Sequence, residues 1–465
     1  MAKVLLIKSS IQDEKYIQYN PPLGLMYIAS TLKEAGNHDV KIIDLRFELK
    51  NINKVINEIK LYSPDIIGFS AFNQEADLVH RLSPIMKNEI TSCKLIIVGG
   101  PYGTSLPDEV LNDDSINIAV IGEGESTMAS IVSLVEQNNL SDIYSIDGIG
   151  FMKNNSVRLN KPVSFIENVD KLPFPDWDLI DISKYAIAPR LGNIRKNRYM
   201  PIFTSRACPY KCMYCHNIFG KGFRSRNPEN VIEEMKILVH NYGIKEFEII
   251  DDIFNLDYQR ALNICELIIK NNLNVKIAFP NGLRCDLLDE NLIKKLKEAG
   301  TYFLGISVET ASPRMQQYIH KNLNLDKVKS TIDLAHKYKI FTVGYFMLGF
   351  PTETKPEMLQ TINYACDSKL NYATFFSVSP FKGTELWEVC KDKIKLYKSG
   401  QFNDFHRKNY NFSTLDNDTF SKIKSRAYRQ FYKKWYRRIL FSGAYKIVRF
   451  DRVFRIFYDR AIKKL

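Results

Sequence analysis

Three cysteines that lie close together in the sequence, Cys208, Cys212 and Cys215, are the residues with the clearest potential for chemistry. Their spacing is Cys-x3-Cys-x2-Cys, within the run Arg206-Ala-Cys-Pro-Tyr-Lys-Cys-Met-Tyr-Cys-His-Asn217. Three thiolates at this spacing can hold three irons of a cubane iron–sulfur cluster. The fourth iron is then left without a protein ligand, so it can bind and reduce a small molecule. The spacing therefore indicates catalysis rather than passive electron transfer.

Two other interpretations of these cysteines fit less well. A structural zinc site commonly uses two Cys-x2-Cys pairs; the chain has no second pair, and His216 adjoins Cys215 too closely to complete a set. A disulfide framework would leave one cysteine over. The remaining cysteines do not cluster, and we expect buried, inert thiols at all of them: Cys93, Cys265, Cys285, Cys366 and Cys390. Eight thiols without a disulfide pattern indicate a reducing compartment.

The N-terminal part of the chain alternates between predicted strands and helices. Apolar runs predict strands at residues 3–7, 39–45, 64–70, 94–100 and 117–125, and helical periodicity predicts helices at 25–34 and 51–61. This alternation is typical of an α/β domain with a doubly wound parallel sheet, which we place at residues 1–140. Residues 141–198, rich in proline and with short strands such as 148–152, are expected to be a linker.

Small residues gather at the carboxyl ends of these strands, where doubly wound sheets bind their ligands. They are Gly24, Ser70, Gly99, Gly100, Gly122 and Gly124. Any one of these glycines alone could serve only a tight turn. Several on one edge would let a large flat ligand approach the backbone closely. The chain has no Gly-x-Gly-x-x-Gly after the first strand, which disfavours a nicotinamide dinucleotide.

A second series of strands and helices follows and carries the cysteines. Strands are predicted at 201–205, 247–252, 276–280, 302–307, 342–347 and 374–379. Six strand–helix units fit a partial (β/α)6 barrel, which we place at residues 199–385, before a C-terminal region at 386–465. Barrel chemistry is set by the loops that follow the strands. The cysteine loop follows the first of these strands, which supports its catalytic interpretation.

Residues 200–385 resemble the radical S-adenosylmethionine (SAM) superfamily. The likeness rests on the cysteine loop, with Tyr214 before the third cysteine, and on residues 250–254, 281–286, 305–310 and 349–353. The resemblance implies a 4Fe–4S cluster, bound by the three cysteines, that cleaves SAM to a 5′-deoxyadenosyl radical. This radical would attack an unactivated carbon, while the protein orients and shields the cofactors. A flavodoxin- or ferredoxin-type electron donor is implied as well.

The same resemblance implies a set of SAM contacts: Tyr214, Asp251, Asp252, Arg284, Ser307 and Glu309. Asp251 and Asp252 end a barrel strand, and for one of the two a helix cap or a loop salt bridge is equally expected. Lys321 could also hold the SAM carboxylate, although a solvated surface charge is its more common fate. No residue is assigned a direct catalytic role.

Residues 1–140 resemble a cobalamin-binding domain through residues 21–25, 99–101 and 122–125. The resemblance implies a cobalamin-binding edge made of Leu23, Gly24, Ser70, Gly99, Gly100, Gly122, Glu123 and Gly124. One feature departs from the pattern. Domains with a histidine cobalt ligand carry Asp-x-His-x-x-Gly after the first strand, whereas residues 9–20 hold no histidine and His38 lies elsewhere. We therefore expect no histidine on the lower face of cobalamin; a relic domain without cofactor is the alternative.

Together these likenesses predict a cobalamin-dependent radical SAM enzyme that methylates a small metabolite or a lipid-like substrate. Cyclisation or rearrangement with the same cofactors, without methyl transfer, is the alternative. A methylthiotransferase acting on tRNA or protein is less favoured, because such enzymes hold a second cluster in an N-terminal domain, where this chain has only Cys93. A non-catalytic iron–sulfur sensor would not need the barrel motifs.

The positive charge of the chain is concentrated at its C-terminal end. Residues 421–465 hold fifteen Lys or Arg against two Asp, an excess of +13 that equals the net charge of the whole chain. Eleven aromatic residues are interleaved with them. We favour a helical cap whose aromatics pack on the barrel; a peripheral membrane contact ranks second and nucleic acid is disfavoured. Because no signal peptide or spanning helix is recognisable, we expect a cytoplasmic protein.

Overall fold

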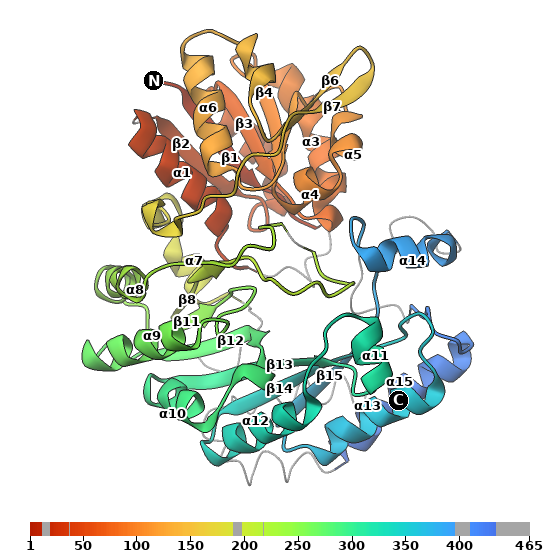
Figure 1. Cartoon of the computed structure of the whole chain (residues 1–465). Coiled ribbons are helices and arrows are strands. Elements are labelled where there is room, and N and C mark those ends of the chain that lie inside the picture. Colours follow the sequence, from red (N-terminus) through yellow and green to blue (C-terminus); the bar gives the residue numbers. More distant parts are fainter. Residues whose placement is uncertain (12–18, 37, 189–197, 217, 396–409, 434–465) are drawn as a thin grey trace. The chain divides into compact units, whose positions relative to one another are not determined.

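The computed structural model describes residues 1–11, 19–36, 38–188, 198–216, 218–395 and 410–433. Contacts between residues divide the chain into two compact units. The first comprises Met1–Ala188 together with Asn217–Gly220, and the second comprises Pro189–His216 and Lys221–Leu465. The predicted α/β fold class is confirmed in each of them (Figure 1).

The first unit is built on one seven-stranded sheet with the strand order β2-β1-β3-β4-β5-β6-β7. Its elements are β1 Lys3–Lys8, α1 Leu23–Gly36, β2 Asp39–Asp44, α2 Ile52–Tyr62, β3 Ile66–Ser70, α3 Ala76–Glu89, β4 Leu95–Gly99, α4 Gly100–Ser105, α5 Pro107–Leu111, β5 Ile118–Val120, α6 Glu125–Glu136, β6 Ile149–Lys153, β7 Ser156–Leu159 and α7 Ile182–Ala186. The first five strands are parallel, as predicted.

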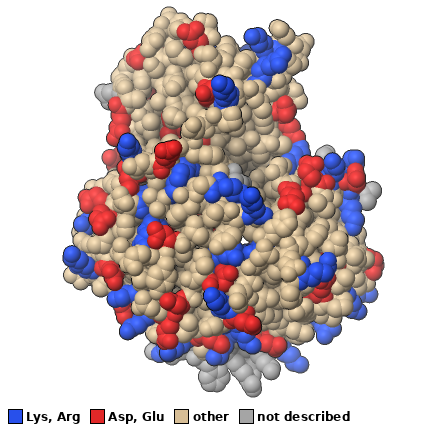
Figure 2. Space-filling model, viewed as in Figure 1, with Lys and Arg blue, Asp and Glu red and all other residues tan. Residues whose placement is uncertain are grey.

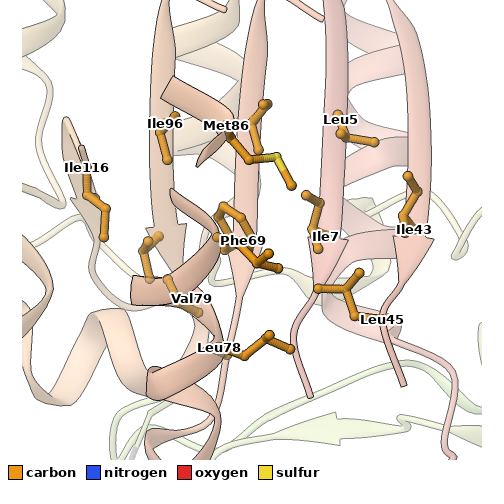
Figure 3. Packing of buried hydrophobic residues seen from close by; sticks show 14 of the residues in the cluster. Leu5, Ile7, Ile43, Leu45, Phe69, Leu78, Val79, Met86, Ile96 and Ile116 are labelled. Carbon is orange, nitrogen blue, oxygen red and sulfur yellow. The ribbon is translucent and has the colours of Figure 1, made fainter. Parts of the chain in front are cut away.

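Side chains that alternate between the two faces of the sheet produce two apolar layers. On β1, Leu5 and Ile7 pack with residues of α2, α3 and α5 on one face of the sheet (Figure 3). Val4 and Leu6 pack with α1 and α6 on the other face. Because successive side chains of a strand point to opposite faces, a continuous apolar run buries both faces of the sheet. The sheet is therefore doubly wound.

The predicted linker at residues 141–198 differs from the structure. β6 and β7 form a hairpin that continues the sheet, pairing antiparallel with β5 and with each other. The two residues between them, Asn154 and Asn155, have φ angles of 50° and 56°. Positive φ at both positions is typical of a type I′ hairpin turn. The hairpin was missed because β7 is mostly exposed and polar, so that no apolar alternation marks it.

The second unit contains a six-stranded, wholly parallel sheet with the order β15-β14-β13-β12-β11-β8. Its elements are β8 Tyr199–Ile202, β9 Ser205–Arg206, β10 Arg224–Ser225, α8 Pro228–Tyr242, β11 Glu246–Ile249, α9 Tyr258–Lys270, β12 Lys276–Leu283, α10 Glu290–Glu298, β13 Thr301–Glu309, α11 Pro313–Tyr318, α12 Leu325–Lys337, β14 Phe341–Leu348, α13 Lys355–Asp367, β15 Tyr372–Ser377, α14 Glu385–Ile394 and α15 Asn417–Tyr432. All six predicted barrel strands are present, which confirms the partial barrel.

The helix α15 covers the last strand of the barrel. Phe420 and Phe431 are buried, Tyr432 donates a hydrogen bond to the Ala373 carbonyl (2.9 Å), and Tyr428 donates one to the Phe375 carbonyl (3.1 Å). The cap interpretation is thus confirmed for the described part of the tail, while residues 434–465 lie outside the described residues. Figure 2 shows acidic and basic side chains interspersed over one face of the molecule. None of the helices in the described ranges has the length and apolar character of a membrane span.

Candidate functional site

The cysteine loop follows β9 at the carboxyl end of the first barrel strand, as predicted. It is fixed by Met213, which is buried, donates its N–H to the Ile319 carbonyl (3.1 Å) and accepts the Leu386 N–H (2.9 Å). The Cys215 N–H donates to the Cys212 carbonyl (3.0 Å), which closes the turn between the two thiols. The loop therefore holds its cysteines on an anchored backbone.

The three thiols fit an iron–sulfur cluster as a donor set. All are free cysteines; Cys208 and Cys212 are half-buried and Cys215 is exposed. Loss of water around the thiol raises the pKa of Cys215 to about 11, although the residue as a whole is exposed. The same cause raises the pKa of Cys208. Iron opposes this effect, because a coordinating thiol is deprotonated by the charge of its metal. Within the described ranges, no three His, Cys, Asp or Glu side chains converge on a single-ion site.

The two aspartates after β11 have different environments. Asp251 is 2% exposed, and its carboxylate accepts hydrogen bonds from the Thr204 N–H (2.6 Å), the Thr204 hydroxyl (2.5 Å) and the Ser205 hydroxyl (2.7 Å). It therefore holds the strand that leads into the cysteine loop, in keeping with the structural role that was the equal expectation for one of the two aspartates. Asp252 is exposed as a residue and accepts the Ala207 N–H; loss of water around its carboxyl, then the charge of Asp251, raises its pKa. Asp252 remains the candidate for SAM or substrate.

A charged group at the end of β13 brings together three predicted residues. Lys321 donates to Glu309 Oε1 (3.0 Å) and to the Tyr214 hydroxyl (3.2 Å), and that hydroxyl also lies 3.4 Å from Glu309 Oε1. Burial, then the charge of Glu309, raises the pKa of Tyr214 well above its ordinary value, so its hydroxyl stays protonated. Lys321 is 12% exposed at its side chain, so the expectation of a solvated surface charge was wrong.

Glu309 has an unusual backbone conformation. Its φ is +64°, in the left-handed region that costs a non-glycine residue about 1–3 kcal/mol. The register between β13 and β14 shifts between Ser307 and Glu309, and such irregularities commonly re-aim a side chain near an active site. Ser307 lies two residues earlier on β13, before this irregularity; it is half-buried, with its hydroxyl 3.5 Å from the Asn281 carbonyl.

Arg284, a predicted SAM contact, packs on the cysteine loop. Its guanidinium carbon lies 3.7 Å from the centre of the Tyr210 ring, and its Nε donates to Asp286 Oδ1 (3.0 Å). Tyr210 belongs to the cysteine loop, and its carbonyl accepts a hydrogen bond from Lys221 (2.6 Å). The carboxylate of Asp286 thus already compensates the charge of Arg284. Arg284 fixes the cysteine loop through a cation–π contact.

The glycine edge of the first unit, defined here as the residues predicted to bind cobalamin, is partly open. A Cβ added to Gly24 would meet nothing within 4 Å, and one added to Gly122 would meet only the Phe165 ring at 4.0 Å. Gly99 ends β4 and Gly100 begins α4; both are half-buried, as is Ser70 at the end of β3. A flat ligand can therefore approach the backbone here, so these residues fit a macrocyclic cofactor.

Three predicted members of this edge are less open. Leu23 is buried in the first turn of α1 and supports the adjoining Gly24. Glu123 is 3% exposed and accepts the Ile166 N–H (2.8 Å). Gly124 packs against Ile28. These residues shape the loops of the glycine edge from within, and their predicted contact with cobalamin stays a prediction.

The sequence reasoning missed charged residues beneath the glycine edge. Lys8, at the end of β1, forms an ion pair with Glu75, and both side chains are buried. Burial lowers the pKa of Lys8, while the charge of Glu75 opposes that change. Phe72, which lies above Lys8 at 4.9 Å from its Nζ, is 49% exposed. The strand prediction placed Lys8 next to an apolar run, but its partner lies 67 residues away and has no sequence signal.

Comparison with known proteins gives a family match in each unit. Residues 202–365 match the radical SAM superfamily, and residues 14–132 match the B12 binding domain. The first match contains the cysteine loop and Glu309, and the second contains the whole glycine edge. Both predicted resemblances are confirmed.

Individual relatives extend over most of the chain. The uncharacterized methyltransferase PH0819 of Pyrococcus horikoshii is 34% identical over 373 residues, covering 80% of this chain and 78% of the relative. The anaerobic magnesium-protoporphyrin IX monomethyl ester cyclase of Rubrivivax gelatinosus is 27% identical over 398 residues, covering 85% and 69%. The structure of the radical S-adenosylmethionine methyltransferase TsrM of Kitasatospora setae, with cobalamin and a 4Fe–4S cluster bound, is similar in fold (TM-score 0.68, 17% identity), covering 84% and 75%.

Proposed function

Because this chain belongs to the radical SAM enzymes that carry a B12-binding domain, we propose that it transfers a methyl group to an unactivated carbon of a small metabolite or a lipid-like substrate. Its cofactors are a 4Fe–4S cluster, SAM and cobalamin. When bound, they supply a carbon-centred radical and a transferable methyl group. The observation that carries the proposal is the group of Glu309, Lys321 and Tyr214, which adjoins the third cysteine in sequence through Tyr214.

The residues of the chain position SAM in this proposal. In the described structure, the hydrogen bonds from Lys321 and Tyr214 both reach Glu309 Oε1. A carboxylate offers about four acceptor sites, so Oε2 of Glu309 is available for the amino group or a ribose hydroxyl of SAM. Lys321, with three donors, can hold the SAM carboxylate while it still contacts Glu309. Asp252 and Ser307 complete the set of candidate contacts.

Cyclisation without methyl transfer is the second candidate, supported by the Rubrivivax cyclase relative. The two reactions differ in what becomes of SAM. The enzyme is reconstituted anaerobically with iron, sulfide and cobalamin, reduced, and incubated with SAM that carries a deuterated methyl group. Methyl transfer predicts S-adenosylhomocysteine in addition to 5′-deoxyadenosine. 5′-Deoxyadenosine without S-adenosylhomocysteine would contradict methyl transfer and favour cyclisation or rearrangement.

The electron donor and the location of the enzyme are also proposals. A flavodoxin- or ferredoxin-type donor is supported by the need to reduce the cluster by one electron. A cytoplasmic location is supported by the eight free cysteines and by the oxygen sensitivity of an exposed cluster. Peripheral membrane contact through residues 434–465 would suit a lipid-like substrate, and vesicle sedimentation of the full-length enzyme tests it.

A further inference from the structure

Residues 161–166 form a short strap, defined by these six residues, that is fixed at three points of the first unit. Its first residue, Lys161, accepts the Gly148 N–H at its carbonyl (2.7 Å). Val163 packs on Gly148, where an added Cβ would lie 3.0 Å from the Val163 Cβ. Its last residue, Ile166, donates its N–H to the buried carboxylate of Glu123 (2.8 Å). The strap is therefore held against the loops that border β5.

Phe165 lies between these fixed points and beside two glycines. Its ring lies 4.0 Å from where a Cβ of Gly122 would be. It also lies so close to Gly220 that any side chain at that position would overlap the ring. Gly122 and Gly220 both have positive φ, +80° and +79°, so both loops adopt a conformation that favours glycine. Even so, Phe165 is 38% exposed, which leaves part of an apolar ring open to a ligand.

The two glycines belong to protein segments next to two different cofactor sites. Gly122 belongs to the glycine edge of the B12-binding domain. Gly220 lies five residues after Cys215, and the described residues 218–220 belong to the first unit although they directly follow the cysteine loop in the chain. A single side chain thus lies beside both the glycine edge and the segment that follows the cysteine loop.

We propose that Phe165 is a positioning residue that couples cobalamin binding to the order of residues 218–222, and so to the cluster loop. The proposal rests on the proposed function, because it needs cobalamin at the glycine edge. When an apolar face of bound cobalamin covers the exposed part of the Phe165 ring, rotation of this ring is restricted. The fixed ring in turn limits the backbone motion of Gly220. Coupling of this kind is reciprocal, so the loaded cluster loop favours cobalamin binding by the same factor.

The test uses hydrogen exchange of the full-length, cluster-loaded enzyme with and without saturating cobalamin, in the absence of substrate. In the native enzyme, cobalamin slows exchange in the peptide that covers residues 218–222 by about tenfold. Phe165→Ala binds cobalamin about tenfold more weakly, as loss of contact with an apolar ring predicts. At saturation it no longer transmits protection to residues 218–222. Phe165→Leu keeps an apolar contact and retains part of both effects.

A matched control is Tyr144→Ala. Tyr144 is an aromatic residue of the same unit with 41% exposure that packs on Phe151, away from the glycine edge. The Tyr144→Ala variant should have the same cobalamin affinity and the same protection of residues 218–222 as the native enzyme. Exchange in β1, β3 and β4 should be the same in all variants, which shows that the sheet stays folded.

The possible outcomes separate this inference from the proposed function. If cobalamin binds the native enzyme and residues 218–222 gain no protection, or if Phe165→Ala at saturation gains the same protection as the native enzyme, the coupling role of Phe165 is overturned and the proposed function stands. If the native enzyme binds no cobalamin at all, the proposed function is overturned and this inference with it.

Discussion

The two units each present a ligand edge at the carboxyl ends of parallel strands, but they use opposite chemistry. The barrel edge offers functional groups: three free thiols, the exposed carboxylate of Asp252 and the pair of Glu309 and Lys321. The glycine edge offers backbone and an exposed aromatic surface, with the ion pair of Lys8 and Glu75 buried beneath it. A small, charged ligand such as SAM is held by charges, whereas a large flat cofactor is accommodated by the absence of side chains.

This difference predicts how each edge responds to mutation. A site made of functional groups fails when one group is removed. A site made of open space fails when a side chain is added. The predictions below test this contrast, from the largest expected effect to the smallest.

The largest effect is expected at the cysteine loop. Cys212→Ala should lose the cluster and abolish formation of 5′-deoxyadenosine, because two remaining thiolates hold a cubane poorly. Iron content and 5′-deoxyadenosine from SAM measure the result after anaerobic reconstitution. Cys93→Ala removes a half-buried thiol from the other unit and should leave both quantities unchanged. Full SAM cleavage by the Cys212 variant would show that the loop does not hold the cluster.

A smaller loss is expected at Glu309. Glu309→Gln removes the charge that pairs with Lys321, and a hydrogen bond to a charged group contributes about 1.5–3 kcal/mol. The SAM dissociation constant should therefore rise about ten- to hundredfold, while the cluster is retained. Equilibrium binding of SAM to the loaded enzyme checks this expectation. Arg314→Gln, which removes an exposed ion pair with Glu357, is the control; equal SAM affinity of native enzyme and Glu309→Gln would remove Glu309 from the site.

The glycine edge should respond to an added side chain. Gly24→Leu introduces a side chain at a helical position where even a Cβ meets nothing within 4 Å. Leucine is a better helix former than glycine by about 0.8 kcal/mol, so the variant should be slightly more stable. Cobalamin affinity should nevertheless fall about tenfold, the effect of about 1.4 kcal/mol of lost contact. Spectroscopic titration with cobalamin and thermal unfolding measure the two quantities. Unchanged cobalamin affinity would show that the ligand lies elsewhere.

The smallest effect on cofactor binding is expected at a buried carboxyl near the barrel edge, whose titration acts on stability instead. Burial raises the pKa of Glu353 to about 8 although it accepts the Gly349 N–H (2.7 Å) and the Phe350 N–H (3.1 Å). Between its ordinary pKa and this value, the folded state binds a proton that the unfolded state lacks. Stability from this group is therefore lost as the pH rises from about 5 to about 8. Glu353→Gln should flatten that decline, as thermal unfolding across this range would show; an identical pH profile in both proteins would contradict it.

The same contrast explains what the sequence could predict. The six barrel strands and the cysteine loop were recognisable because apolar runs mark the strands and reactive side chains mark the loop. The glycine edge was recognisable only as a set of small residues, one of which, Gly124, packs against Ile28 of α1. No residue type marks a surface that is left open for a ligand, so such a surface is hard to recognise in a sequence.

Contacts between distant residues could not be predicted. Asp251 and Asp252 are neighbours in sequence, and only the hydrogen bonds from Thr204 and Ser205 show which of them is structural. Lys321 was expected in solvent because lysine side chains are mostly exposed, yet Glu309, twelve residues away, pairs with it. Phe165 lay in a predicted linker, and nothing in the sequence connects it to Gly220.

The most direct test of the central claim is Mössbauer and EPR spectroscopy of the oxygen-free, full-length protein before and after SAM is added. We predict a 4Fe–4S cluster with one iron distinct from the other three, and a signal of the reduced cluster that changes when SAM binds. Tetrahedral zinc at the cysteine loop, no metal there, or a cluster indifferent to SAM would contradict the claim.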